Sequence, residues 1–188
     1  MKIAGVVLAA GASTRLGRPK QTVIIDGEAL VERAARVAHE AGLSPVIVVV
    51  NSQAEFAEQL LAQGCMIVVN EHAAKGMASS IHCGVSAADG CDGVVVMACD
   101  QPALTSAHLM ALCAESGTAS GSAYGGKIGI PAYFPASNFG SLLQLKGDTG
   151  ARDLLRNARA VPFEDLSFDI DTEEDIAQLR AKTKCDPH

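Results

Sequence analysis

The sequence predicts an α/β protein with a doubly wound, mostly parallel sheet in three α/β/α layers. Short continuous apolar runs alternate along the chain with segments of helical periodicity. These runs also lack a polar face, so each strand must be covered on both sides, as in a parallel sheet between two helical layers. A length of 188 residues suits one domain, expected over 1–188 with 181–188 as a frayed tail.

Strands and helices follow one another in turn through residue 115. The strands are runs of β-branched residues, whereas the helices carry apolar residues at spacings of three and four. Gly42 ends the first helix, and Thr105 or Ser106 caps the last. The expected strands are 2–9, 45–50, 65–69 and 93–98, and the expected helices are 27–42, 52–63, 76–88 and 105–115.

The second half is less regular. Residues 122–124 give a weak strand signal, and 128–134 read as a strand that Pro131 places at an edge or a bulge. Thr172 and Asp175 resemble a capping box at the start of a terminal helix. The remaining expected elements are helices at 140–145, 149–158 and 172–181 and a strand at 161–163.

Composition excludes several classes of function. A net charge of −6 argues against nucleic-acid binding, which needs a basic face. No apolar run approaches the roughly 18 residues that a membrane span requires. The six cysteines form no C-x-x-C pair, so reduced thiols in a cytoplasmic protein are expected.

A turn of small residues followed by cations comes directly after the first strand. It reads Leu8-Ala9-Ala10-Gly11, and Arg15, Arg18 and Lys20 follow closely. Small side chains allow a backbone to approach a ligand, and exposed amides hold anionic oxygens. The spacing is neither a Walker A loop nor G-x-G-x-x-G. Because ligands of α/β folds bind at the carboxyl ends of strands, we interpret this segment as a triphosphate receptacle; a basic surface loop is the alternative.

Carboxylates near the ends of two other segments suggest a magnesium site. Asp100 follows the fourth strand in Cys99-Asp100-Gln101-Pro102, and Asp169 and Asp171 lie two residues apart in Asp169-Ile170-Asp171-Thr172. Mg²⁺ prefers oxygen ligands and shares them with phosphates. Either Asp169 or Asp171 serves as the second ligand, and a turn or cap role is the alternative for each Asp.

Two further polar segments open helices. In 70–81, Gly76 begins a helix whose amides favour anions or polar base edges, with Asn70 and Ser80 nearby. In 146–152, Arg152 is a candidate for holding the phosphate of a second substrate, although Asp148 also suits a helix cap.

Together these segments resemble the MobA-like NTP transferases, and within them the molybdenum cofactor cytidylyltransferases. The motifs L-A-A-G-x-S-x-R-x-G-x-x-K, N-x(5)-G-M-x-x-S, C-D-Q-P, G-D-x-G-A-R and D-I-D-T run in the family's order from Leu8 to Thr172. The resemblance implies a Rossmann-like nucleotidyltransferase fold and Mg²⁺-dependent transfer of CMP from CTP to molybdopterin, with release of pyrophosphate. It also implies a molybdoenzyme, or its chaperone, as the receiver of the product.

The resemblance implies a role for each matching residue. Arg15, Lys20 and Asp100 would be catalytic, and Asp100 with Asp171 would hold the metal. Asp148 and Arg152 would contact the acceptor. The nucleotide would be held by Leu8, Ala9, Ala10, Gly11, Asn70, Gly76 and Ser80.

Two positions bear on specificity. Guanylyltransferase relatives usually have L-A-G-G in the first motif, so Ala10 favours CTP. Family members often have G-H-P where this chain has Gly129-Ile130-Pro131, which leaves the acceptor open. The alternatives are therefore a guanylyl or other NTP transferase acting on a sugar phosphate or another small acceptor. Outside that class, an NAD(P)-linked oxidoreductase or a non-catalytic cofactor-binding chaperone remains.

Overall fold

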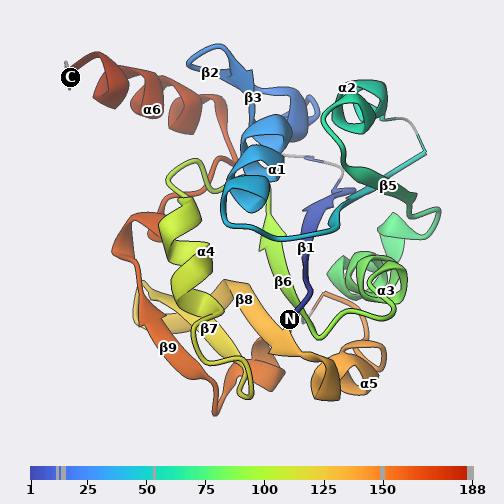
Figure 1. Cartoon of the computed structure of the whole chain (residues 1–188). Helices are drawn as coiled ribbons and strands as arrows, with labels where there is room; N and C mark the ends of the chain where they lie inside the picture. Colours follow the sequence, from blue (N-terminus) through green and yellow to red (C-terminus); the bar gives the residue numbers. More distant parts are fainter. Residues whose placement is uncertain (12, 14–15, 53, 149–150, 186–188) are drawn as a thin grey trace.

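The computed structural model describes residues 1–11, 13, 16–52, 54–148 and 151–185, with side chains as far as residue 181. Its main sheet contains β1 (Ile3–Ala9), β4 (Val46–Val50), β5 (Met66–Val69), β6 (Gly93–Ala98), β7 (Ser120–Tyr124), β8 (Lys127–Pro135) and β9 (Arg159–Pro162). The strand order is β5-β4-β1-β6-β8-β7-β9 (Figure 1). Within this sheet only β8 runs antiparallel to its neighbours, so the mostly parallel sheet is confirmed.

Helices cover both faces of this sheet (Figure 1). One face carries α1 (Leu30–Glu40), α2 (Ala57–Ala62) and α4 (Ser106–Leu112), and the other carries α3 (Met77–Ala87) and α5 (Phe139–Leu142). Alternate strand residues face opposite layers, so Val7 packs with the α1 side while Val6 packs with the α3 side. Runs without a polar residue therefore supply both cores, and the three layers are confirmed.

The strand order reverses at the centre of the sheet. The chain proceeds from β1 to β4 and β5 on one side, then returns to place β6 on the other side of β1. Leu8 and Ala98 are paired near the carboxyl ends of β1 and β6. The segments after these two strands consequently emerge side by side, at the position where doubly wound folds bind ligands.

A third apolar cluster ties the end of the chain to its beginning. The hairpin of β2 (Ile24–Ile25) and β3 (Glu28–Ala29) lies beside α6 (Glu173–Cys185) (Figure 1). The cluster consists of Leu16, Val23, Ile25, Leu30, Ile170 and Ile176. Because Ile170 and Leu16 share this cluster, the Asp169–Asp171 segment is drawn to the turn that follows β1.

Several expected boundaries were wrong. The helix expected at 27–42 begins only at Leu30, because β3 precedes it, and the helix expected at 52–63 is limited to α2. Of the expected helix 149–158, residues 149 and 150 lie outside the described residues. The rest contains a 3-10 turn over Arg152–Leu155 in place of the helix, because the chain must then extend to pair β9 with β7. Pro131 lies inside the sheet and not at an edge. Adjacent residues 121 and 122 of β7 pair with residues 132 and 129 of β8, so the strands bulge at Pro131, and the expected bulge is confirmed. Helix α6 continues to Cys185, past the expected end at 181, and residues 186–188 of the expected tail lie outside the described residues.

Among the described helices, none combines the length and the apolar character needed to cross a bilayer.

Candidate active site

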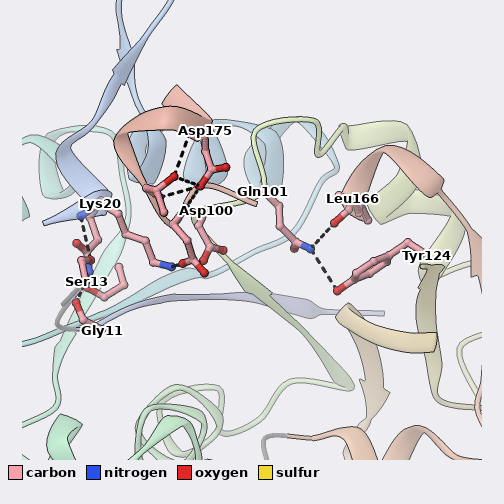
Figure 2. A network of polar contacts seen from close by, with 12 residues as sticks. Gly11, Ser13, Lys20, Asp100, Gln101, Tyr124, Leu166 and Asp175 are labelled. Atoms are coloured by element: carbon pink, nitrogen blue, oxygen red, sulfur yellow. Dashed lines mark hydrogen bonds and ion pairs between the residues drawn. The ribbon is translucent and has the colours of Figure 1, made fainter. Parts of the chain in front are cut away.

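Lys20 meets two aspartates from distant parts of the sequence, Asp100 and Asp171, beyond β1 and β6. Figure 2 shows Lys20 and Asp100 pointing toward one another. Lys20 begins a 3-10 helix, η1 (Lys20–Thr22), whose first amide donates to Ser13 Oγ at 3.0 Å. Its Nζ donates to Asp100 Oδ2 and lies 3.2 Å from Asp171 Oδ1. Lys20 of the cationic turn, Asp100 and Asp171 thus form one cluster.

Backbone and capping bonds hold the two aspartates in place. Ile170 N donates to the Asp100 carbonyl at 3.0 Å, which joins the two carboxylate-bearing segments. Asp175 Oδ2 accepts from Asp171 N at 3.0 Å and from Thr172 N at 2.7 Å (Figure 2). Asp175 N in turn donates to Thr172 Oγ1, which confirms the capping box. Asp171, the residue that contacts Lys20, is therefore the better placed of the two candidate second ligands.

The charges of the cluster are strongly coupled. Burial alone would lower the pKa of Lys20, but Asp100 and Asp171 outweigh it and raise that pKa. The pKa of Asp169 is raised, first by partial loss of solvent and then by repulsion from Asp100 and Asp171. Burial raises the pKa of the adjacent Cys99 thiol to about 12, so this thiol is not a nucleophile near neutral pH. The cluster therefore has a surplus of negative charge that a further cation would offset.

The donor set suits a magnesium ion that shares its coordination with a ligand. Among the described residues, no three His, Cys, Asp or Glu side chains gather closely enough to hold a metal by themselves. Asp100 and Asp171 supply hard carboxylate oxygens, and Mg²⁺ is commonly bound by one or two carboxylates together with waters and substrate phosphates. The two residues would hold the ion only in company with such a ligand.

A cavity of about 540 Å³ opens beside this cluster. Five of the expected nucleotide-binding residues line it: Leu8, Ala10, Gly11, Gly76 and Ser80. Ala9 points away into the core of the α1 face. Asn70 is buried behind the wall, where Nδ2 donates to Ser79 Oγ and Ser80 Oγ and Oδ1 accepts from His72 N. Asn70 therefore positions Ser80 in this structure, and does not line the cavity.

The start of α3 forms another wall of the cavity. Gly76 has a φ of +99°, and Met77 N donates to Asp148 Oδ1 at 3.3 Å. Ala78 N donates to the Gly147 carbonyl at 3.1 Å. Asp148, expected to contact the acceptor, thus caps the amino end of α3 and also lines the cavity.

A smaller cavity of about 130 Å³ adjoins the first and shares Met77 and Asp148 with it. Arg152, Lys127 and Tyr124 bring two cations and a phenol to its walls. Ile130, which stands where family members often have His, also lines it. Of the two residues expected at the acceptor, Asp148 lines both cavities and Arg152 lines the smaller one.

The set of site residues predicted from the sequence differs from the set found in the structure. Arg15 lies outside the described residues. Arg18 pairs with Glu173 through Nε at 2.8 Å, at an exposed position at the start of α6. Three residues that lie in the site were missed: Gln21, Lys127 and Tyr124. For Gln21 the only sequence signal is its position beside Lys20 of the first motif. Lys127 and Tyr124 flank a turn that contains no motif.

Residues 5–162 match the family described as MobA-like NTP transferase domain. This chain belongs to the MobA-like NTP transferase family. The MobA-like chain is 32% identical over 194 residues to the purine catabolism protein PucB of Bacillus subtilis, covering 94% of this chain and 95% of that protein. It is 33% identical to nicotine blue oxidoreductase of Paenarthrobacter nicotinovorans, covering 94% and 96%. A probable molybdenum cofactor guanylyltransferase of Opitutus terrae is 34% identical, over 56% of this chain and 51% of that protein.

Solved structures agree with this MobA-like assignment. A nucleotidyl transferase from Methanothermobacter, Mth528, has a TM-score of 0.81 at 26% identity, with 98% of this chain and 99% of that chain covered. Rv0371c of Mycobacterium tuberculosis, in a complex with manganese, has a TM-score of 0.76 at 26% identity, covering 96% and 99%. The chain is therefore a nucleotidyltransferase that acts on a nucleotide and a small acceptor.

Proposed function

We propose that this enzyme transfers CMP from CTP to molybdopterin with the help of Mg²⁺ and releases pyrophosphate. The observation that carries the proposal is the meeting of Lys20, Asp100 and Asp171 at the rim of the 540 Å³ cavity. A cation and two carboxylates at the mouth of a nucleotide-sized cavity are what a metal-bound triphosphate requires.

The two adjoining cavities suggest how the substrates are arranged. The nucleotide would occupy the larger cavity and the acceptor the smaller one, with the α-phosphorus near their shared wall at Met77 and Asp148. An oxygen of the acceptor phosphate attacks the α-phosphorus in line, and the bond to the β-phosphate oxygen breaks as pyrophosphate leaves. Lys20 stabilises the charge that develops, and Arg152 and Lys127 hold the acceptor phosphate.

A divalent ion would neutralise the triphosphate when bound. The manganese complex of the Rv0371c structure supports a divalent site in this family. Asp100 and Asp171 are the proposed ligands here.

The choice of base and acceptor rests on motifs. Ala10 and Cys99-Asp100-Gln101-Pro102 favour CTP, whereas the Opitutus terrae relative is named as a guanylyltransferase. The molybdopterin acceptor is supported by the same relative's name and by the cationic walls of the smaller cavity.

The deciding experiment is pyrophosphate release from each of the four NTPs with Mg²⁺, with and without molybdopterin. We expect release with CTP that depends on both the metal and the pterin. Pyrophosphate release with GTP in place of CTP would overturn the assignment of the base. If no NTP gave pyrophosphate in the presence of molybdopterin, the assignment of molybdopterin as acceptor would be wrong.

The Asp100→Asn variant tests the site itself. Loss of one metal carboxylate should reduce turnover by at least about a hundredfold, as expected when an electrostatic group acting on the transition state is removed. Asp92→Asn is a matched control, because Asp92 precedes the same strand at its opposite end, where its carboxylate accepts from Lys2 N. Equal activity of the Asp100 and Asp92 variants would contradict the assignment.

One relative supports a second candidate function. Nicotine blue oxidoreductase is similar over almost its whole length, so reduction of an acceptor by a nicotinamide nucleotide in the same cavity is the competing activity. Against it, the turn after β1 lacks G-x-G-x-x-G. Oxidation of NADH or NADPH, followed at the absorbance of the reduced nicotinamide, separates the two functions.

A further inference from the structure

Gln21 lies against the turn that follows β1, with 2% of its surface exposed. Its Nε2 donates to the carbonyls of Ala9 and Gly11, each at 2.8 Å. The orientation of the amide follows from chemistry, because a carbonyl oxygen accepts but never donates, so nitrogen must face both carbonyls. One side chain thus joins two peptide groups of the turn whose residues Ala10 and Gly11 line the large cavity.

These two bonds matter for an anionic ligand. A carbonyl oxygen without a hydrogen-bond donor would repel the oxygens of a triphosphate beside it. A turn that contains glycine can also adopt many backbone conformations. Gln21 satisfies both carbonyls and restricts the turn to one shape. The same short helix η1 is held to the turn a second time, since Lys20 N donates to Ser13 Oγ. Lys20 and Gln21 therefore link the turn to the carboxylate cluster as one unit.

The other end of the amide differs from the first. Gln21 Oε1 is buried and has no hydrogen-bond partner among the described residues. A buried acceptor without a donor destabilises a protein, and such groups in native structures are concentrated where function requires them. An apolar side chain of similar shape would avoid this cost but would leave the carbonyls of Ala9 and Gly11 without their donor, so what the glutamine supplies is its pair of bonds to the turn.

We propose that Gln21 is a positioning residue that holds the Ala9–Gly11 turn in the shape that receives the triphosphate. This inference rests on the proposed nucleotidyl transfer. It assigns to Gln21 an effect on nucleotide affinity that is exerted through the turn, without contact with the reacting atoms.

Gln21→Met is the informative substitution, because methionine has a similar length but donates no hydrogen bond. We expect the KM for the NTP to rise about tenfold, as two net hydrogen bonds imply, while the KM for the acceptor stays the same. The melting temperature is measured in parallel, because the substitution removes the buried Oε1 but also leaves the carbonyls of Ala9 and Gly11 without their donor. Gln21→Glu also cannot donate when ionised and adds a negative charge near the triphosphate, so its KM for the NTP should rise further.

Thr22→Val is the matched control on the same 3-10 helix. The exposed Thr22 hydroxyl donates to the Pro19 carbonyl, at 2.9 Å, and does not hold the Ala9–Gly11 turn, so this variant should keep the wild-type KM for the NTP. An unchanged KM for the NTP in Gln21→Met would overturn the proposal. So would a parallel rise of both KM values together with a lower melting temperature, which would indicate a purely structural role.

Hydrogen exchange separates this inference from the proposed function. Without any ligand, the backbone amides of residues 8–13 should exchange faster in Gln21→Met than in the wild type or in Thr22→Val. If the wild type neither binds nor turns over any NTP, the proposed function fails, yet faster exchange would still establish that Gln21 holds the turn. Unchanged exchange would refute that hold, whatever the enzyme's activity.

Discussion

At position 76 the chain requires a residue without a side chain, for two separate reasons. The φ of +99° is a conformation that residues with a Cβ rarely adopt. A Cβ there would also lie 2.7 Å from the Gly147 carbonyl carbon and would press on the Asp148 carboxylate. Because Gly76 and Asp148 both line the large cavity, strain at this residue would reach the ligand site directly.

Gly76→Ala is therefore expected to reduce both stability and nucleotide affinity. The backbone conformation alone should cost about 1–3 kcal/mol of unfolding free energy, and displacement of the Gly147–Asp148 segment should add to that. Gly90→Ala is the control. Gly90 also has a positive φ, +76°, but a Cβ added there would have no atom of the described residues within 4 Å. Denaturant unfolding and NTP titration of both variants give the comparison. Equal losses in the two variants would mean that the contact with Asp148 contributes nothing.

At the scale of elements, the site depends on the way α6 begins. Thr172 and Asp175 cap this helix reciprocally, and the same Asp175 carboxylate accepts from the amide of Asp171, the proposed metal ligand. The cap therefore serves both the helix and the orientation of one carboxylate. Arg18 adds a bond from the turn to Glu173 in the first turn of α6.

Thr172→Ala tests this double role. Loss of the cap should lower the unfolding free energy by about 1 kcal/mol, and Mg²⁺ should be needed at higher concentration for half-maximal turnover. Thr105→Ala removes the cap of α4, where Thr105 Oγ1 accepts from His108 N at 3.3 Å. It should lower stability to a similar extent but leave the Mg²⁺ requirement unchanged. A shifted Mg²⁺ requirement in the Thr105 variant as well would show that general destabilisation is responsible.

The elements also show what the sequence can and cannot predict. Strands β1, β4 and β6 were predicted closely because long apolar runs rich in β-branched residues are typical of strands buried on both faces. The edge strand β5 is partly exposed, and its run of Ile and Val predicted it nonetheless. The β2–β3 hairpin was missed because its strands have two residues each, too few to show a period. Arg159 and Ala160 belong to β9 because they pair with the edge of β7. Such pairing depends on the tertiary fold and cannot be predicted from the local sequence.

The site likewise contains some residues that the sequence could predict and others that it could not. Asp100 and Asp171 were predictable because one follows a strand end and the other precedes a helix cap, and Lys20 was predictable because it belongs to the motif that follows β1. Gln21 was not, because its role depends on where the carbonyls of Ala9 and Gly11 point after folding. Lys127 and Tyr124 reach the smaller cavity through the β7–β8 pairing, whose partner strand was only a weak signal.

At the scale of the whole molecule, the half of the sheet away from the Lys20 cluster has its own pH-sensitive group. His108 on α4 is buried, and its Nε2 lies 2.8 Å from Ser122 Oγ on β7. Since the Ser122 hydroxyl donates to the Pro131 carbonyl, the neutral imidazole must donate through Nε2. The ring also packs on Phe163, with 4.7 Å between centroids. Burial lowers the pKa of His108, so the folded protein favours the uncharged ring.

This arrangement makes the stability of the molecule fall on mild acidification. The unfolded chain takes up a proton at His108 below its usual pKa of about 6.5, whereas the folded chain resists it, so protonation favours unfolding. The contribution of His108 is therefore intact above about pH 7 and declines as the pH falls through 6.5 toward the lower pKa of the folded state. In His108→Gln, which keeps an amide donor for Ser122, the unfolding free energy should decline less between pH 7.5 and pH 5.5 than in the wild type. Denaturant unfolding at both pH values measures the difference, and parallel declines in the two proteins would rule out His108 as its source.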